Sequence, residues 1–346
     1  MATGRLRDLD DLRLGLSAWL AGPQSVVPDA EVRAVSRASA GYSNESLVVD
    51  VDGPRGRERL VVRLPTLEPS LPDYDLPMQA VVHAVLATAG IPVPDPVTVV
   101  DDPSWVGTPF VVMPFIEGHV LGEVPALDRW LTERPVVEQR LVHDRFIQLL
   151  ARVHRVDWST TSAAGVVRGG GRCLTDELEW WRRYAERTST DVPFLPLVEG
   201  LDWCRHHCPS NEPPASLLWG DPRLGNVIVD DDCRVVAALD WDLASIGPAE
   251  MDLAWYLVLD DVTTSALGSS VPGFPEHEET IGNYEEQLGR RLVDYRWHEV
   301  FAVCRALAIS NCQARIAGAA GEPYVSPADE GNPLVGVLGR RIAAFG

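Results

Sequence analysis

Two stretches decide the fold: Leu217-Leu-Trp-Gly-Asp-Pro-Arg-Leu-Gly-Asn-Val-Ile-Val (217–229) and Val235-Val-Ala-Ala-Leu-Asp-Trp-Asp (235–242). Each contains an apolar run, and three consecutive aspartates (230–232) separate the two runs. Apolar runs joined by turn-forming residues are typical of a β-hairpin. A strand that leaves Asn226, turns and comes back brings Asp240 to the same end of the hairpin. We therefore expect an amide and a carboxylate to lie side by side there.

The polar side chains of these stretches are those that phosphoryl transfer needs. Asp221 and Asn226 have the Asp-x-x-x-x-Asn spacing of kinase catalytic loops, where the aspartate takes the proton of the attacking hydroxyl. Asn226 and Asp240 supply an amide and a carboxylate oxygen, which Mg²⁺ accepts together with phosphate oxygens and water. We predict Asp221 as a catalytic residue and Asn226 and Asp240 as metal ligands. Asp242 either touches a second metal or caps the next turn.

The composition is that of a globular protein and excludes several kinds of chemistry. The chain has 346 residues, of which 46% are hydrophobic, and all 30 of its positive side chains are arginines. Without lysine, a Schiff base and a Walker A phosphate loop are both excluded. The net charge of −20 repels nucleic acid and anionic membranes, so we expect neither as a partner. We also expect a cytoplasmic protein, because the cysteines form no disulfide framework and the N-terminus lacks the pattern of a signal peptide.

Apolar patterning divides the chain into a strand-rich part and a helix-rich part. In the first part we expect helices at 6–20 and 77–89 and strands at 45–51, 59–64, 97–100 and 110–115. In the second part we expect one hairpin (227–229 and 235–239) among helices at 136–156, 175–187, 194–208, 276–290 and 297–317. This order predicts an α+β fold of two lobes with a ligand site in the crevice between them.

Three motifs together resemble the aminoglycoside phosphotransferase and choline kinase superfamily: Trp219-Gly-Asp-Pro-Arg-Leu-Gly-Asn226, Leu239-Asp-Trp-Asp242 and Gly247-Pro-Ala-Glu-Met-Asp-Leu-Ala254. More narrowly, they resemble the kinase-like domains of some acyl-CoA dehydrogenase fusions and similar actinobacterial phosphotransferases. The resemblance covers most of the chain. It implies a protein-kinase-like fold, with a small antiparallel-sheet lobe that binds nucleotide (1–113) and a larger, mainly helical lobe for catalysis and acceptor binding (114–346).

The N-terminal part can be matched to the nucleotide site of that family. The residues that resemble its phosphate-facing loop are Gly41, Tyr42, Ser43 and Asn44, for which the alternative is a plain hairpin turn. Arg63 falls where kinases place the lysine that grips the α- and β-phosphates. Gln79 falls where they place the acidic partner of that lysine, and it departs from the pattern because a neutral amide forms no ion pair. The alternative for both is a solvated position.

The resemblance also suggests nucleotide and phosphate contacts near the middle of the chain. The segment 110–118 is similar to the hinge that holds a nucleobase through main-chain atoms, with Met113, Pro114 and Ile116 as the contacts. A proline at 114 offers only its carbonyl, which this role allows; the alternative is an ordinary core strand. Arg223 falls where many kinases place a γ-phosphate lysine and is our second catalytic candidate, with a surface arginine as the alternative.

Several further positions are interpreted as structural. Trp219 replaces the histidine usual in the family, and we expect it to serve packing. We expect Asp252 to brace the catalytic loop by accepting backbone hydrogen bonds, and His154 to be a buried core histidine. An aromatic stripe lies where the family walls its acceptor pocket, and such stripes are also typical of a core: Trp180, Trp181 and Tyr184.

The resemblance implies an enzyme that uses Mg²⁺ and ATP or GTP to phosphorylate a hydroxyl of a small molecule. An aminoglycoside-like acceptor is our first hypothesis, and an amino alcohol or a hydroxyacyl-CoA is the alternative acceptor. A nucleotide-binding pseudokinase without transfer is the alternative from another class, because Gln79 and Trp219 depart from the family pattern. The sequence leaves the acceptor, the nucleotide base and the oligomeric state open.

Overall fold

The computed structural model describes residues 6–40, 44–68, 70–71, 75–168, 174–188, 194–211, 213–321 and 332–345. These residues form two compact units. The first lies within 1–84, 94–116 and 315–324, and the second within 85–93, 117–314 and 325–346. Nucleotide binding by segment 1–113, and catalysis and acceptor binding by segment 114–346, stay predictions.

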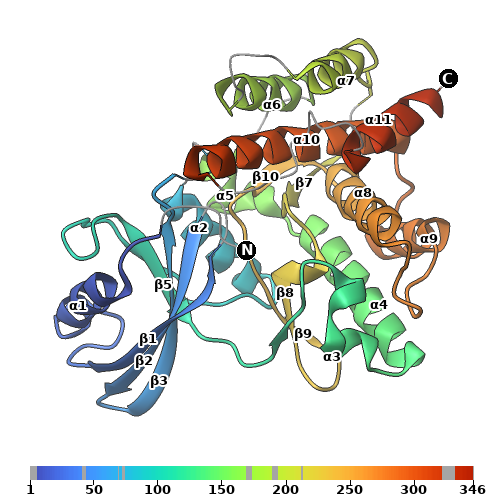
Figure 1. The fold of residues 1–346 in the computed structure, drawn as a ribbon. Helices are drawn as coiled ribbons and strands as arrows, with labels where there is room; N and C mark the ends of the chain where they lie inside the picture. The colour runs from blue at the N-terminus through green and yellow to red at the C-terminus, as the bar shows by residue number, and fades with distance from the viewer. Residues whose placement is uncertain are drawn as a thin grey trace. The chain divides into compact units, whose positions relative to one another are not determined.

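The first unit is built on a five-stranded antiparallel sheet in the order β1-β2-β3-β5-β4 (Figure 1). Its strands are β1 (Glu31–Ala40), β2 (Asn44–Gly53), β3 (Gly56–Pro65), β4 (Thr98–Val100) and β5 (Phe110–Pro114), and its helices are α1 (Leu9–Leu20) and α2 (Leu76–Thr88). Strands β2 and β3 are ten residues each, longer than the sequence patterning indicates, because their ladder continues to the hairpin turn.

Helix α1 covers the apolar core of this sheet. Leu12, Leu16 and Trp19 recur at helical spacing and are buried, and Trp19 meets Phe110 edge to face at 5.4 Å. The helix begins three residues later than expected. The side chain of Asp8 accepts hydrogen bonds from the two backbone N–H groups at 10 and 11, and so caps a helix that starts at Leu9.

The second unit consists mainly of helices with two small antiparallel sheets (Figure 1). The helices are α3 (Arg129–Thr132), α4 (Val136–His154), α5 (Ala163–Val166), α6 (Leu174–Thr188), α7 (Leu195–His206), α8 (Glu250–Leu267), α9 (His277–Leu288), α10 (Tyr295–Ala320) and α11 (Pro333–Ala343). Short 3-10 turns lie at Pro125–Leu127, Trp158–Thr160 and Leu224–Asn226. One sheet has the order β6-β8-β9, from β6 (His119–Val120), β8 (Val227–Val229) and β9 (Val235–Ala238).

The expected hairpin forms as β8 and β9, but it is not the only strand pairing in this part. A second sheet pairs β7 (Ala215–Leu218) with β10 (Ser245–Pro248), in antiparallel register from Leu218 opposite Ser245. Strands of four residues are too short to show the two-residue alternation on which sequence interpretation relies. The segment that contains Asp221, Asn226 and Asp240 begins directly after β7 and ends directly before β10, so this sheet holds its two ends together.

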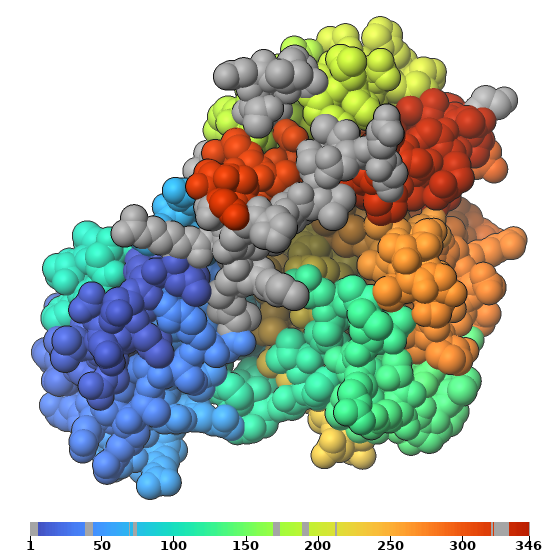
Figure 2. Space-filling model, viewed as in Figure 1, coloured from blue at the N-terminus to red at the C-terminus, as the bar shows by residue number. Residues whose placement is uncertain are grey.

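Aromatic side chains from several helices fill the core of the second unit. Phe146 of α4 packs against Tyr256 of α8 at 4.8 Å, and Trp297 of α10 donates to the carbonyl oxygen of Cys204 on α7 at 3.0 Å. Helices α6 and α7 lie along α10 (Figure 2). Although α10 has 26 residues, no helix in the described part of the chain is apolar enough to cross a bilayer.

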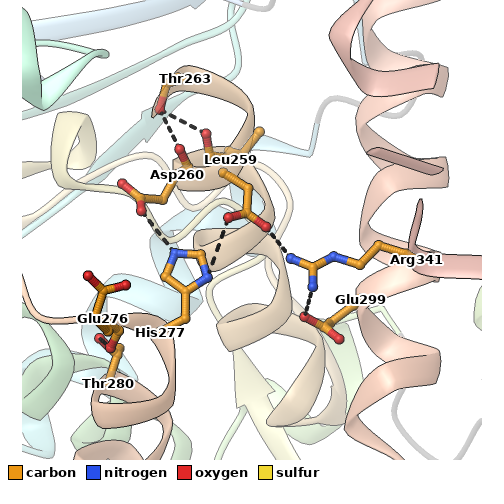
Figure 3. Close-up of polar contacts among 9 residues, drawn as sticks. Leu259, Asp260, Thr263, Glu276, His277, Thr280, Glu299 and Arg341 are labelled. Atoms are coloured by element: carbon orange, nitrogen blue, oxygen red, sulfur yellow. Dashed lines mark hydrogen bonds and ion pairs between the residues drawn. The ribbon is translucent and has the colours of Figure 1, made fainter. Parts of the chain in front are cut away.

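A polar cluster ties four helices of this unit together (Figure 3). His277 of α9 pairs with Asp260 of α8 at 3.0 Å and faces Asp261 at 3.6 Å. Arg341 of α11 pairs with Asp261 and with Glu299 of α10, the latter at 3.0 Å. Burial lowers the pKa of His277, but the hydrogen bond to Asp260 and the two aspartate charges outweigh it and raise the pKa above its ordinary value. The cluster therefore favours a charged imidazolium.

His298 of α10 has the opposite environment and generates a prediction about acid stability. It is buried, neither ring nitrogen has a hydrogen-bond partner among the described residues, and burial lowers its pKa to about 4. Between about pH 6.5 and pH 4 the unfolded chain binds a proton that the folded chain excludes, so folding stability falls by up to about 3 kcal/mol as the pH drops.

We expect His298→Leu to remove this loss, because leucine keeps the volume and has nothing to protonate. Urea unfolding at pH 7, 5.5 and 4.5 measures it, with His206→Leu at the exposed end of α7 as the control. The wild type and the control should lose more stability on acidification than His298→Leu does. Equal pH slopes for all three proteins would contradict the role given to His298.

Candidate active site

The β8–β9 hairpin places Asn226 and Asp240 at one end, as the sequence predicts. Val227 pairs with Ala238, and the backbone N–H of Leu239 donates to the carbonyl oxygen of Asn226 at 2.8 Å. Asp240 is the next residue, and its φ of 61° is rare for a residue with a side chain. The chain therefore leaves the sheet sharply at the residue predicted to bind metal.

Three side chains converge on the carboxylate of Asp221. Asn226 donates its amide N–H to Oδ2 at 3.0 Å, and Arg223 Nε lies 3.0 Å from the same oxygen. The indole N–H of Trp255 donates to Oδ1 at 2.7 Å. Both oxygens of the proposed base are therefore held, each from a different direction.

Arg223 is partly buried and paired, unlike a solvated surface arginine. The charge of Asp221 is the main cause that raises its pKa, with further contributions from Glu123 and Asp240, and burial opposes them. Its guanidinium lies 3.6 Å from the carboxylate of Glu123, which is mostly exposed. A permanent cation thus lies against the carboxylate of Asp221 and within the electrostatic influence of Asp240.

Asn226 and Asp240 are suited to a Mg²⁺ ion that is also bound by phosphate. Asn226 is buried and its Nδ2 is held by the carbonyl and carboxylate oxygens of Asp221 at 2.9 and 3.0 Å, which assigns Oδ1 as the atom for a metal. Among the described residues there is no group of three His, Cys, Asp or Glu side chains that forms an all-protein metal site. A two-ligand set completed by phosphate and water is the arrangement that Mg²⁺ prefers.

A buried carboxylate on α8 holds the loop before Asp221, which confirms the role predicted for Asp252. Its oxygens accept the backbone N–H of Trp219 at 2.7 Å and of Gly220 at 3.1 Å. His154 of α4 is also buried and faces Asp252 through Nε2 at 3.0 Å and Tyr284 of α9 through Nδ1. Because all these groups are dry, each lost contact leaves an unpaired polar atom.

The backbone at position 220 allows only glycine. Gly220 has a φ of 89°, and a Cβ atom there would lie 2.2 Å from the carbonyl oxygen of Leu243. The catalytic loop and the segment after Asp240 therefore touch through their backbones.

Trp219 is a packing residue, as expected, and it also links the two loops. Its ring stacks on that of Trp241 at 5.0 Å with 13° between the planes, and its N–H donates to the carbonyl oxygen of Leu239 at 2.7 Å. Leu239 and Trp241 flank Asp240, so the indole pair fixes both neighbours of the proposed metal ligand.

The predicted nucleotide residues belong to the first unit. Arg63 lies in β3, the middle strand of the sheet, and it is buried, not solvated. Burial is the main cause that lowers the pKa of His83 on α2 to about 4, and the charge of Arg63 lowers it further. Gln79, one turn before His83, is buried too, and its amide nitrogen has no hydrogen-bond partner among the described residues.

The remaining predicted nucleotide contacts are divided between strands and an undescribed loop. Asn44 begins β2, Met113 and Pro114 end β5, and Ile116 follows as a half-buried residue. Gly41, Tyr42 and Ser43 lie outside the described residues. The binding roles of all these positions stay predictions.

Sequence interpretation missed two residues close to Asp221. Trp255 lies on α8 one helical turn after Asp252, so i+3 spacing was the available signal. Arg305 of α10 donates to the carbonyl oxygen of Gly220 at 2.8 Å from 85 residues away, a contact that no local pattern indicates. Trp181 and Tyr184 are fully buried core residues, whereas Trp180 is half-buried.

Asp252→Asn tests how strongly the loop depends on its brace. An amide offers one acceptor oxygen in place of two and turns an N–H toward a buried donor, so we expect a loss of about 2 to 4 kcal/mol in unfolding free energy. The same change at the fully exposed Asp231 is the control and should cost less than about 0.5 kcal/mol. Urea denaturation measures both, and equal losses would contradict the brace.

Comparison with curated proteins finds relatives that contain a similar segment. The chain is 25% identical over 280 residues to acyl-CoA dehydrogenase family member 11 of Homo sapiens, and this match covers 78% of the chain and 34% of the relative. The chain thus spans about a third of the length of the first relatives it matches. The narrower resemblance inferred from the motifs is confirmed.

Solved structures confirm the protein-kinase-like α+β fold. An aminoglycoside phosphotransferase-like protein of Ralstonia eutropha has a TM-score of 0.64 at 20% identity, covering 94% of each chain. The GDP and kanamycin complex of an APH(2″)-type enzyme has a TM-score of 0.59 at 15% identity, covering 96% of this chain and 99% of that one. A model of the phosphotransferase enzyme family matches residues 34–299, and the chain therefore belongs to that family.

Proposed function

We propose that this phosphotransferase moves the γ-phosphoryl group of ATP or GTP to a hydroxyl of a small molecule. The observation that carries the proposal is the convergence of Asn226, Arg223 and Trp255 on the carboxylate of Asp221, with Asp240 at the same hairpin end as Asn226. A fixed carboxylate, a permanent cation and two oxygen ligands are the parts that phosphoryl transfer uses.

The proposed site residues have different roles in the transfer. Asp221 orients the acceptor hydroxyl and takes its proton. Arg223 leaves its pairing with Asp221 to neutralise the γ-phosphate, and Arg63 binds the α- and β-phosphates through its planar fork. Asn226 and Asp240 hold Mg²⁺, which supplies charge neutralisation of the phosphate oxygens when it is bound.

Two acceptor classes each have an observation in their favour. The structural neighbour that holds kanamycin favours a cationic aminoglycoside or amino alcohol, and the net charge of −20 suits such an acceptor. The acyl-CoA dehydrogenase relatives favour a hydroxyacyl-CoA instead. These acceptors have opposite charges, so one experiment separates them.

The test is mass spectrometry of products after incubation with Mg²⁺, ATP or GTP, and a panel of kanamycin, a macrolide, amino alcohols, sugars and hydroxyacyl-CoAs. Asp221→Asn serves as the control because it keeps the side-chain shape and removes the base. A phosphorylated product that is absent with the control supports the proposal and identifies the acceptor class. Nucleotide binding without any product in the panel favours the pseudokinase.

Asp240→Ala should abolish turnover, because it removes the only charged ligand proposed for the metal. We expect the rate to fall at least about a thousandfold, which corresponds to several kcal/mol of lost charge stabilisation. Asp231→Ala, on the exposed turn of the same hairpin, is the matched control and should keep the wild-type rate. Undiminished turnover with Asp240→Ala would rule out the metal assignment.

A further inference from the structure

We infer that Trp255 is a positioning residue for the catalytic carboxylate and that a buried arginine, Arg305, holds it in place. The inference rests on the proposed function, in which Asp221 receives the proton of the acceptor. Trp255 of α8 and Arg305 of α10 both lie outside the three sequence motifs.

The hydrogen bonds of Asp221 show why Trp255 matters. The indole N–H of Trp255 donates to Oδ1 at 2.7 Å, whereas Oδ2 accepts the amide N–H of Asn226 at 3.0 Å and forms an ion pair with Arg223 Nε at 3.0 Å. An indole N–H can donate but never accept, so it orients the carboxylate in every step without competing for the transferred proton. Trp255 is also buried at 4% exposure, which keeps water from replacing it.

Trp255 becomes more important when phosphate is present. Arg223 is the partner of Asp221 that would turn to the phosphate, because its guanidinium is partly exposed and also lies near Glu123. Once Arg223 turns to the γ-phosphate, Asn226 and Trp255 are the side chains that keep Asp221 in place, one on each oxygen. Loss of the indole N–H would then leave the carboxylate free to rotate about its Cβ–Cγ bond.

Arg305 fixes Trp255 and the catalytic loop at once. Its guanidinium carbon lies 4.8 Å from the ring centre of Trp255 and 5.0 Å from that of Trp181, and Nη2 donates to the carbonyl oxygen of Gly220 at 2.8 Å. The side chain is fully enclosed, and burial lowers its pKa while the charges of Glu177, Asp252 and Asp221 support the cation. One guanidinium thus contacts the residue before Asp221 and the donor to Asp221.

The chain offers a matched control for Trp255. Trp181 packs against the same guanidinium and is also buried, but its indole N–H donates to Glu177 at 3.0 Å, and Glu177 pairs with Arg168 at 2.6 Å. Replacing either tryptophan by phenylalanine removes one N–H and leaves a similar cavity beside Arg305. Only Trp255→Phe removes a hydrogen bond to Asp221.

The first test reads the contact in the resting protein and needs no turnover. The indole N–H resonance of Trp255, assigned by through-bond correlation to its own backbone, is followed in ¹⁵N spectra of the wild type and of Asp221→Ala. We expect that resonance to move upfield when the carboxylate is removed, and the resonance of Trp181 to stay in place. An unmoved Trp255 resonance would overturn the inference, whatever the activity of the protein.

The second test compares the steady-state kinetics of Trp255→Phe and Trp181→Phe with an acceptor found in the product panel. For Trp255→Phe we expect kcat to fall about tenfold to a hundredfold, the effect of losing one hydrogen bond to a charged group, with KM for the nucleotide within about twofold. Trp181→Phe should keep the wild-type kcat. Thermal unfolding of both variants then excludes a general packing defect as the cause of any loss. Equal losses in the two variants, or none in Trp255→Phe, would contradict the positioning role.

The two tests separate this inference from the proposed function. If the wild type forms no product with any acceptor, the proposed function fails, and the spectra still show whether Trp255 holds Asp221. If the wild type is active and the chemical shift of the Trp255 indole N–H is the same in Asp221→Ala, the proposed function stands and the positioning role is wrong.

Discussion

The second unit depends on one buried carboxylate, Asp252, and on the backbone groups it satisfies. Trp219 and Gly220 lie between the end of β7 and the 3-10 turn at Leu224–Asn226, outside every strand and helix, so their backbone N–H groups need acceptors from elsewhere in the fold. Asp252 accepts two of them and also faces His154, which joins α8, α4 and the catalytic loop in one dry network. Gly220 then turns with a positive φ at a point where a Cβ atom would collide with the carbonyl oxygen of Leu243, and Asp221 follows directly.

The loop that carries Asp240 is attached to the same frame by aromatic packing. The stacked indoles of Trp219 and Trp241 connect the residue just before Gly220 with the residue just after Asp240. Hydrogen bonds from both indoles to the carbonyl oxygens of Leu239 and Ala238 prevent the pair from sliding. The proposed base, Asp221, and the proposed metal ligand, Asp240, therefore lie on two loops that packing holds together, which is what catalysis by positioning requires.

The chain has arginine but no lysine, and three of its arginines differ in their surroundings. Arg63 is buried in the middle strand of the first unit, Arg223 is half-buried against Asp221, and Arg305 is fully enclosed between aromatic rings and a carbonyl oxygen. Arg305 would be poorly replaced by lysine, because a buried ammonium loses its proton readily whereas a guanidinium stays charged.

Local sequence sufficed for contacts within a hairpin or a short motif, and it failed for contacts between distant helices. The hairpin pattern predicts that Asn226 and Asp240 lie at the same end of the β8–β9 pair. The motif that contains Asp252 predicts that this carboxylate braces the loop. In contrast, Trp255 and Arg305 reach the loop from 34 and 85 residues away, so no local period contains them. The β7–β10 sheet was not predicted for a related reason, because strands of four residues are too short to show the apolar alternation that indicates a strand.

We propose that Asn226 and Asp240 hold the metal beside Asp221, the proposed base. The most direct measurement is a crystal structure with Mn²⁺ and a nonhydrolysable nucleotide, in which anomalous scattering locates the ion. We predict one manganese peak within bonding distance of an oxygen of Asn226 and an oxygen of Asp240, with the terminal phosphate facing Asp221. A bound nucleotide whose metal lies away from both side chains would contradict it.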